Sequence, residues 1–237
     1  MSPIADNLQA VRRRISEALQ GDSRTVTLVA VTKSKPAQAI REAFAAGCRD
    51  FGESYVQEAL PKLASLRDLA VTWHFIGHLQ TNKARDVARA FEWVHGVDRL
   101  RLAQALSRSR PAEKEKLNVC VQVNISGEAT KGGVAPTDAL VLAREVAAMP
   151  NLALRGLMGM AAPGDDVAVQ RREFATLARV RDEIVAAGIP LDTLSMGMSD
   201  DFEAAIAEGS NMVRVGTAIF GARPSPQPSP KGEGAPL

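Results

Sequence analysis

The feature that most constrains the fold of this chain is a regular alternation of short apolar, β-branched blocks with longer helix-like blocks. Strands are predicted at 27–33, 50–54, 72–77, 93–97, 118–124, 152–160, 193–198 and 212–217. Helices are predicted between them, near 37–46, 55–67, 81–91, 99–110, 136–149, 165–187 and 199–208. This alternation indicates parallel strands, because the crossover between two parallel strands is usually a helix. An open doubly wound sheet competes with a closed barrel, but eight near-regular units in 237 residues favour a single (β/α)8 TIM barrel.

The two ends of the chain differ from this alternation. Apolar residues recur at helical spacing over 4–19, and Gly21 then ends the predicted helix. Residues 223–237 are rich in proline, serine and glycine and have almost nothing to bury, which predicts a disordered tail. We therefore expect one barrel domain over 1–222. Helix C-caps are expected at Gly47, Gly188 and Gly209.

Composition and charge argue against several classes of function. The 29 basic and 27 acidic residues nearly balance and form no long basic stripe, so neither a nucleic-acid surface nor a membrane surface is expected. The chain starts with a charged amphipathic segment rather than a signal peptide, and no apolar stretch approaches the ~20 residues of a membrane span, which predicts a cytoplasmic protein. Cys48 and Cys120 lack metal-ligand spacing, and His74, His78 and His95 resemble no zinc motif. We expect no metal site, and structural, hydrogen-bonded roles for the histidines.

Lys33 is the strongest candidate for chemistry. It closes the apolar strand 27–33 and therefore lies at the carboxyl end of the first strand, where parallel α/β folds build their sites. A desolvated lysine there can lose its proton and attack a carbonyl group to form a Schiff base. A solvated lysine at a strand end is the simpler alternative. The residues at the ends of the last two strands favour the reactive lysine.

Those last two predicted strands end in an expected phosphate site. Ser199 follows the seventh strand, and Gly216 and Thr217 follow the eighth, where a short helix begins. In barrels the loops after strands seven and eight, together with the N–H groups at the start of such a helix, usually bind phosphate. Ser199 could instead be only a helix N-cap. Asp200 and Asp201 would repel a phosphate, so we expect both to face solvent.

Arg214 adds a buried cation to this group. It alternates with Val213 and Val215, so its side chain points to the opposite face from theirs, into the barrel. A buried guanidinium needs an acceptor, which would be a ligand atom or a carboxylate such as Glu53, and a structural ion pair is the simpler alternative. A reactive lysine, a phosphate site and an inward arginine at one rim together suggest pyridoxal phosphate (PLP).

The chain resembles the pyridoxal phosphate homeostasis proteins, which are relatives of the barrel domain of alanine racemase. The matching runs are 28–36, 51–58, 73–83, 123–125, 154–158, 195–199 and 214–221. The resemblance implies a barrel of the alanine racemase N-terminal type, with PLP covalently attached to Lys33 as a Schiff base. It also implies phosphate contacts from Ser199, Gly216 and Thr217, and it places Arg214 beside the pyridine nitrogen. The cofactor-binding residues predicted in full are Lys33, Ser54, Asn124, Met158, Ser199, Arg214, Gly216 and Thr217.

Two features of the predicted site concern the residues around the cofactor: Ser54, which differs from the usual residue of the family, and a set of methionines. The family usually has asparagine where this chain has Ser54, and the shorter side chain either loses a contact or bridges it through water. Met158, Met160, Met196 and Met198 alternate along their strands, so they are expected first in the core and second as a wall of the cofactor site.

These expectations favour a protein that binds PLP and buffers it or hands it on, with PLP-dependent apo-enzymes as possible recipients. An arginine beside the pyridine nitrogen keeps that nitrogen unprotonated and weakens the ring as an electron sink. Alanine racemase compensates with a tyrosine base from a further domain, whereas the only tyrosine here is Tyr55. No catalytic residue is therefore assigned, and a monomer is expected, because this chain lacks the domain that pairs racemase subunits. The alternatives are a one-base amino-acid racemase or lyase with Tyr55 or Glu53 as base, and a sugar-phosphate enzyme that uses a Lys33 Schiff base.

Overall fold

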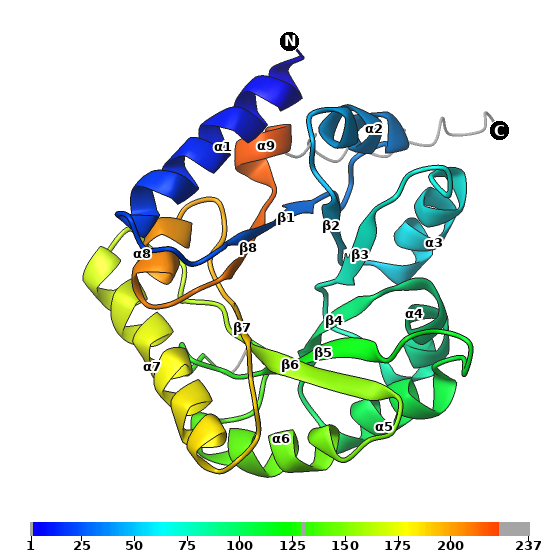
Figure 1. Cartoon of the computed structure of the whole chain (residues 1–237), viewed down its shortest axis with the longest axis vertical. Helices are drawn as coiled ribbons and strands as arrows, with labels where there is room; N and C mark the ends of the chain where they lie inside the picture. The colour runs from blue at the N-terminus through cyan, green and yellow to red at the C-terminus, as the bar shows by residue number, and fades with distance from the viewer. Residues whose placement is uncertain (1, 129–130, 223–237) are drawn as a thin grey trace, which may run out of the picture.

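The computed structural model describes residues 2–128 and 131–222, which form a closed barrel of eight parallel strands (Figure 1). The strands follow one another around the barrel in chain order, and the last pairs with the first over four residue pairs to close it. The fold class predicted from the alternation of blocks is therefore confirmed. The predicted tail, 223–237, lies outside the described residues.

All eight predicted strands are present, but most are shorter than expected. They are β1 Thr27–Val31, β2 Asp50–Glu53, β3 Thr72–Phe75, β4 Trp93–Val97, β5 Leu117–Gln122, β6 Leu152–Met158, β7 Thr193–Ser195 and β8 Met212–Val215. Each begins within one residue of its expected start, and most end up to three residues early. The residues beyond these ends leave the sheet and form the rim of the barrel.

Helices form an outer ring around the strands (Figure 1). They are α1 Pro3–Leu19, α2 Ala37–Ala45, α3 Val56–Ser65, η1 Thr81–Lys83, α4 Ala84–Ala90, α5 Leu100–Ser109, η2 Pro136–Asp138, α6 Ala139–Ala147, α7 Val167–Ala186, α8 Phe202–Ala207 and α9 Thr217–Phe220. Positive φ angles of 84°, 88° and 99° at Gly47, Gly188 and Gly209 confirm the predicted C-caps, since glycine adopts this conformation without strain. The first helix, α1, packs against α8 and α9 and so joins the outer ring beside the last two helices (Figure 1).

The barrel interior is partly polar, whereas the layer between strands and helices is apolar. Barrels of this class usually fill the interior with branched apolar side chains. Here His74 of β3, His95 of β4, Ser195 of β7 and Arg214 of β8 are all buried. His95 and Ser195 share a hydrogen bond although β4 and β7 are not neighbours in the sheet, so this contact crosses the interior.

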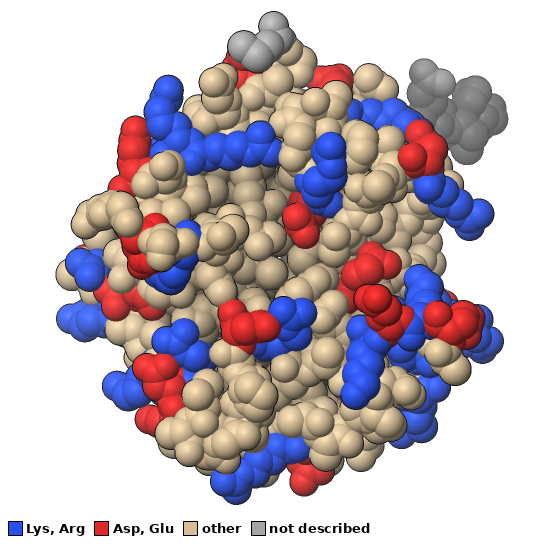
Figure 2. Space-filling view, in the orientation of Figure 1, with Lys and Arg blue, Asp and Glu red and all other residues tan. Residues whose placement is uncertain are grey.

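The surface of the barrel is mixed in charge, and its two cysteines are buried. Basic and acidic side chains are interspersed on the face shown in Figure 2. No helix within the described ranges is long and apolar enough to cross a membrane. Cys48 and Cys120 are free thiols, and burial raises their pKa values to about 11 and about 12. Both therefore stay protonated near neutral pH.

Candidate functional site

A cavity of about 230 Å³ lies at the carboxyl ends of the strands. It brings together six of the predicted cofactor-binding residues, Lys33, Ser54, Ser199, Arg214, Gly216 and Thr217. They come from the loops after β1, β2 and β7, from β8 and from the start of α9. The cavity is further lined by Val31, Lys35, Ile76, Met160, Met198, Asp200 and Gly221. The first and the last strand thus contribute to one site.

The other two predicted residues lie outside this cavity. Met158 lines a neighbouring cavity of about 450 Å³, which shares two wall residues with the first. The side-chain amide of Asn124 donates to the carbonyl oxygen of Glu128 at 2.9 Å, and its Oδ1 accepts the backbone N–H of Gly127 at 3.1 Å. Asn124 therefore shapes the loop after β5. Its contact with a cofactor stays a prediction, as does that of Met158.

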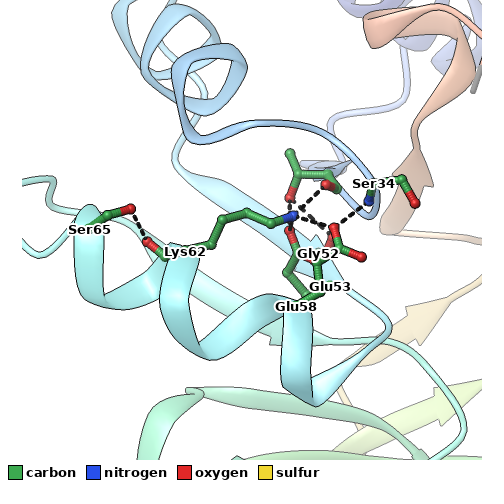
Figure 3. A network of polar contacts seen from close by, with 7 residues as sticks. Ser34, Gly52, Glu53, Glu58, Lys62 and Ser65 are labelled. Carbon is green, nitrogen blue, oxygen red and sulfur yellow. Dashed lines mark hydrogen bonds and ion pairs between the residues drawn. The ribbon is translucent and has the colours of Figure 1, made fainter. Parts of the chain in front are cut away.

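The loop that carries Lys33 is fixed by a buried ion-pair network around Lys62 of α3 (Figure 3). Lys62 Nζ donates to the carbonyl oxygen of Thr32 at 2.9 Å, and to Oε1 of both Glu53 and Glu58 at 2.7 Å. The side chain of Lys62 is only 10% exposed, so these contacts replace water around a charged group. Lys62 thereby joins α3 to the ends of β1 and β2.

Of the two acceptors considered for Arg214, a ligand atom or a carboxylate such as Glu53, the structure excludes Glu53. It is fully buried, and its Oε1 accepts hydrogen bonds from Thr32 Oγ1 at 2.6 Å and from Lys62 Nζ at 2.7 Å. Its Oε2 is the one buried side-chain polar atom without a hydrogen-bond partner in the part of the chain that the structure describes. Burial raises the pKa of the Glu53 carboxyl above its ordinary value. The cation that pairs with Glu53 is therefore Lys62 of α3, outside the barrel, and not Arg214 of β8.

An unusual backbone conformation and a second lysine set the course of the chain beyond Lys33. Ser34 has a positive φ of 61°, which few residues other than glycine adopt, and Glu58 accepts its backbone N–H (Figure 3). Lys35 Nζ donates to three consecutive carbonyl oxygens, those of residues 220–222, at 2.9, 3.2 and 3.1 Å. The Lys33 loop is therefore anchored to α3 on one side and to the end of α9 on the other.

The predicted phosphate site lies between the loop after β7 and the start of α9. Ser199 Oγ accepts the backbone N–H of Ala218 at 3.3 Å, which holds these two segments together. A Cβ on Gly216 would lie 3.3 Å from atoms of Val31, so glycine at this position allows close packing on β1. Thr217 is the first residue of α9 and lines the cavity. Phosphate contacts from Ser199, Gly216 and Thr217 stay predictions.

The two aspartates after Ser199 differ from each other. Asp200 is exposed, as expected, and lines the cavity. Asp201 is buried, which corrects the expectation that it faces solvent. Its Oδ1 accepts the backbone N–H of Met198, and burial raises the pKa of its carboxyl. The side chain folds back because it closes the turn that precedes α8.

Arg214 points into the barrel from β8, as its alternation with valines predicts. It is 5% exposed, and its Nη1 donates to the backbone oxygen and to Oγ of Ser195, each at 2.7 Å. Its Nη2 donates to the carbonyl oxygen of Gly159 at 3.1 Å. Burial lowers the pKa of the guanidinium to about 10, so it still carries its charge near neutral pH. These hydrogen-bond partners are neutral oxygens, and the carboxyl of Asp201 adds a favourable charge interaction, so Arg214 presents a charged guanidinium where it lines the cavity.

The residue types at the cavity fit PLP. Lys33 offers an amine to an aldehyde, Arg214 offers a cation, and the hydroxyls of Ser199 and Thr217 offer hydrogen bonds to a phosphate. The flexible side chains of the lining methionines suit the face of an aromatic ring. One site can therefore hold a small phosphorylated aldehyde by both its ends.

Sequence reasoning missed the residues that anchor the Lys33 loop, chiefly Lys35, Glu58 and Lys62. The spacing of Glu58 and Lys62, four residues apart on a predicted helix, was a usable signal, because such pairs face the same side. The three carbonyl oxygens that bind Lys35 lie at the far end of the chain, so the sequence held no comparable signal for this contact.

Comparison with known proteins gives one consistent result. Residues 2–224 match the family described as "Alanine racemase, N-terminal domain". The pyridoxal phosphate homeostasis protein of Pseudomonas aeruginosa is 57% identical over 226 residues, which cover 94% of this chain and 97% of the relative. That of Escherichia coli strain K12 is 51% identical over 230 residues, which cover 94% of this chain and 98% of the relative. The structure of PipY of Synechococcus elongatus PCC7942 with PLP bound is 38% identical, with a TM-score of 0.81 over 92% of this chain and 100% of that chain.

The fold and the family match define a (β/α)8 barrel of the alanine racemase N-terminal type. Within that class the two curated relatives are named for PLP homeostasis, and they align over nearly their whole length. The chain belongs to the pyridoxal phosphate homeostasis protein family.

Proposed function

We propose that this chain binds PLP as a Schiff base on Lys33 and, in the cytoplasm, buffers it or hands it on to PLP-dependent apo-enzymes. The observation that carries the proposal is the convergence of Lys33, Arg214, Ser199 and Thr217 on one cavity. The PLP-bound structure of PipY and the names of the curated relatives support it.

Each of these residues has a role that suits its chemistry. Lys33 supplies the amine, and Ser199 with the N–H groups at the start of α9 would hold the phosphate. Arg214 would face the pyridine nitrogen, where its fixed positive charge opposes protonation. When bound, PLP supplies an electron sink, which an unprotonated ring provides poorly. This arrangement favours binding without turnover.

The alternative of a racemase or lyase draws no support from the two candidate bases. Tyr55 is 52% exposed and lines a neighbouring cavity together with Lys83; this cavity shares Ser54 with the one that contains Lys33. Glu53 is fully buried and bonded to Lys62. Neither residue lines the cavity that contains Lys33.

Trapping of the cofactor with borohydride tests the proposal. Protein loaded with PLP is reduced, digested and mapped by mass spectrometry, and we expect a pyridoxyl adduct on Lys33. Lys33→Ala should lose this adduct and its reducible absorption band, because the variant lacks the attacking amine. Lys83→Ala, which replaces a lysine of the rim outside the cavity, should keep both. Undiminished trapping in Lys33→Ala would refute the assignment.

Two measurements distinguish a carrier from a catalyst: exchange of the substrate's α-proton and transfer of PLP to an apo-enzyme. A racemase or lyase must remove the α-proton of an amino acid, so loaded protein with single enantiomers in deuterated water would incorporate deuterium. We expect no incorporation above that of free PLP. A PLP-dependent apo-enzyme should regain activity from the loaded protein, and failure to do so would limit the role to buffering.

A further inference from the structure

A chain of hydrogen bonds crosses the barrel interior and ends at Arg214. Asp50 Oδ1 lies 3.0 Å from His74 Nε2, and His74 Nδ1 lies 3.0 Å from His95 Nε2. His95 Nδ1 lies 2.8 Å from Ser195 Oγ, which accepts from Arg214 Nη1 at 2.7 Å. The five residues come from β2, β3, β4, β7 and β8, so the chain links strands on different sides of the barrel.

The chain of hydrogen bonds runs from one end of the barrel to the other. Asp50 is the first residue of β2, at the amino end of the strands, and its side chain is 29% exposed. His74, His95 and Ser195 are fully buried. Arg214 lines the cavity at the carboxyl end. A line of polar groups through a low-dielectric interior is costly unless its members are bonded, and here each one is bonded to the next.

The chemistry of the two ends fixes the direction of every bond. A guanidinium has only donors, so Ser195 Oγ accepts from Arg214. Among the contacts of the described residues, the hydroxyl proton of Ser195 has one remaining partner, His95 Nδ1. His95 therefore carries its proton on Nε2 and donates to His74, and His74 donates from Nε2 to the carboxylate of Asp50. All the bonds point from the cation toward the anion.

The state of His95 agrees with this direction. Burial lowers the pKa of His95 well below its ordinary value, and the neighbouring His74 and Arg214 lower it further. A neutral His95 ring has one proton to donate and one lone pair to accept with. The opposite direction would require a charged His74 and would leave the buried Ser195 hydroxyl without an acceptor.

We propose that Asp50, His74, His95 and Ser195 are positioning residues for Arg214. They form a one-way chain that holds the guanidinium at the cavity and keeps protons from reaching the ring-nitrogen position through the barrel. A proton could travel from Asp50 toward the cavity only if every bond of the chain reversed, and reversal of the last bond would require the guanidinium to accept a hydrogen bond. The hydrogen-bond chain thus stabilises the fixed charge of Arg214 and does not conduct protons to the cavity. This proposal rests on the proposed function, which gives Arg214 a ring nitrogen to face.

The direction of the chain is tested in cofactor-free protein by nitrogen-15 NMR of labelled histidine rings. The protein has three histidines, and His78, whose side chain is 65% exposed, serves as the internal reference. We expect His74 and His95 both to be neutral at neutral pH, each with its proton on Nε2. A proton on Nδ1 of His95, or an imidazolium at His74, would overturn the proposal.

The positioning role is tested with two matched serine variants. Ser195→Ala removes the link to Arg214, whereas Ser210→Ala removes another fully buried hydroxyl, which donates to backbone carbonyl oxygens. Because the lost bond involves a charged group, Ser195→Ala should weaken PLP binding about tenfold. Ser210→Ala should bind PLP as the wild type does. Equal affinities in the two variants would contradict a positioning role.

The histidine spectrum also separates positioning from a merely structural role. Either end alone still fixes the direction of the bonds, so Ser195→Ala and Asp50→Leu should each keep both tautomers, whereas the double variant, which lacks both ends, should release them. Where the double variant does not fold, Asp50→Leu alone decides: because His95 still donates to His74 Nδ1, the proton of His74 should stay on Nε2, and a proton on Nδ1 of His74 would refute the chain. These tautomers are read without PLP, so absence of the Lys33 adduct in the wild type would refute the proposed function independently of them.

Discussion

The ammonium group of Lys62 contacts two carboxylates and one carbonyl oxygen at the base of the Lys33 loop. Replacement by methionine keeps much of the volume of this side chain but leaves the buried carboxyl of Glu53 without its cation. Removing one partner of a buried ion pair typically costs about 3–5 kcal/mol, so we expect Lys62→Met to lower the free energy of unfolding by this amount. Urea denaturation followed by circular dichroism measures the change.

Lys116 offers the matched control for this prediction, because it is exposed and lies directly before β5. Lys116→Met should change the free energy of unfolding by no more than about 0.5 kcal/mol, as is usual for surface substitutions. If Lys62→Met were no less stable than Lys116→Met, the Lys62 network would not hold the ends of β1 and β2 as described.

The location of a single residue could be predicted from the sequence where it depends only on the residue's position along one strand. Lys33 and Arg214 belong to this group, because the carboxyl ends of parallel strands meet at one rim. Partners across the barrel belong to another group. His95 and Ser195 are 100 residues apart, and strand alternation says that both point inward without saying that they meet. For the same reason the sequence could name Glu53 only as one possible acceptor for Arg214, which the structure excludes.

At the scale of whole elements, the starts of the strands were predicted better than their ends. The apolar pattern continues past the last residue of the sheet at Ile76, Met160 and Met198, because these side chains line the cavity instead. An apolar cavity wall and an apolar strand look alike in a sequence. The overlong strand predictions therefore coincide with the rim of the site.

Two neighbouring strands approach each other too closely for a side chain at Gly156 of β6. A Cβ there would lie 1.7 Å from the carbonyl oxygen of Thr193 in β7, so the two strands would have to separate. Overpacking typically costs about 1–3 kcal/mol and occasionally more, and because this clash is with backbone atoms we expect Gly156→Ala to be destabilised by about 3 kcal/mol or not to fold. Thermal and urea denaturation measure the loss.

Gly132→Ala is the control for this strand contact. A Cβ on Gly132 would have its nearest neighbour at 3.4 Å, which is ordinary van der Waals contact. We expect its free energy of unfolding to stay close to that of the wild type. Equal stabilities of Gly156→Ala and Gly132→Ala would mean that β6 and β7 separate at little cost.

At the scale of the whole molecule, the cavity lies across the seam where the barrel closes. β1 and β8 pair over four residues, Lys33 follows β1, and Arg214 lies in β8. Lys35 strengthens this seam through its bonds to the carbonyl oxygens after α9. The eight repeating units predicted a closed barrel, but only the structure shows that the site joins its two ends. A ligand in this cavity therefore contacts both the start and the end of the fold.

Ligand binding should consequently slow hydrogen exchange most strongly at this seam. At a PLP concentration 100 times its Kd, binding stabilises the native state by about 2.7 kcal/mol. Hydrogen exchange that requires an opening from which the ligand dissociates should therefore be about 100-fold slower. Mass spectrometry of exchanged peptides should show this slowing at 27–35 and 212–221, with β4 as the internal reference. Inorganic phosphate should slow exchange only near Ser199 and 216–218, because it has no aldehyde for Lys33. Equal slowing in β4 and at the seam would contradict a site that lies across the closure of the barrel.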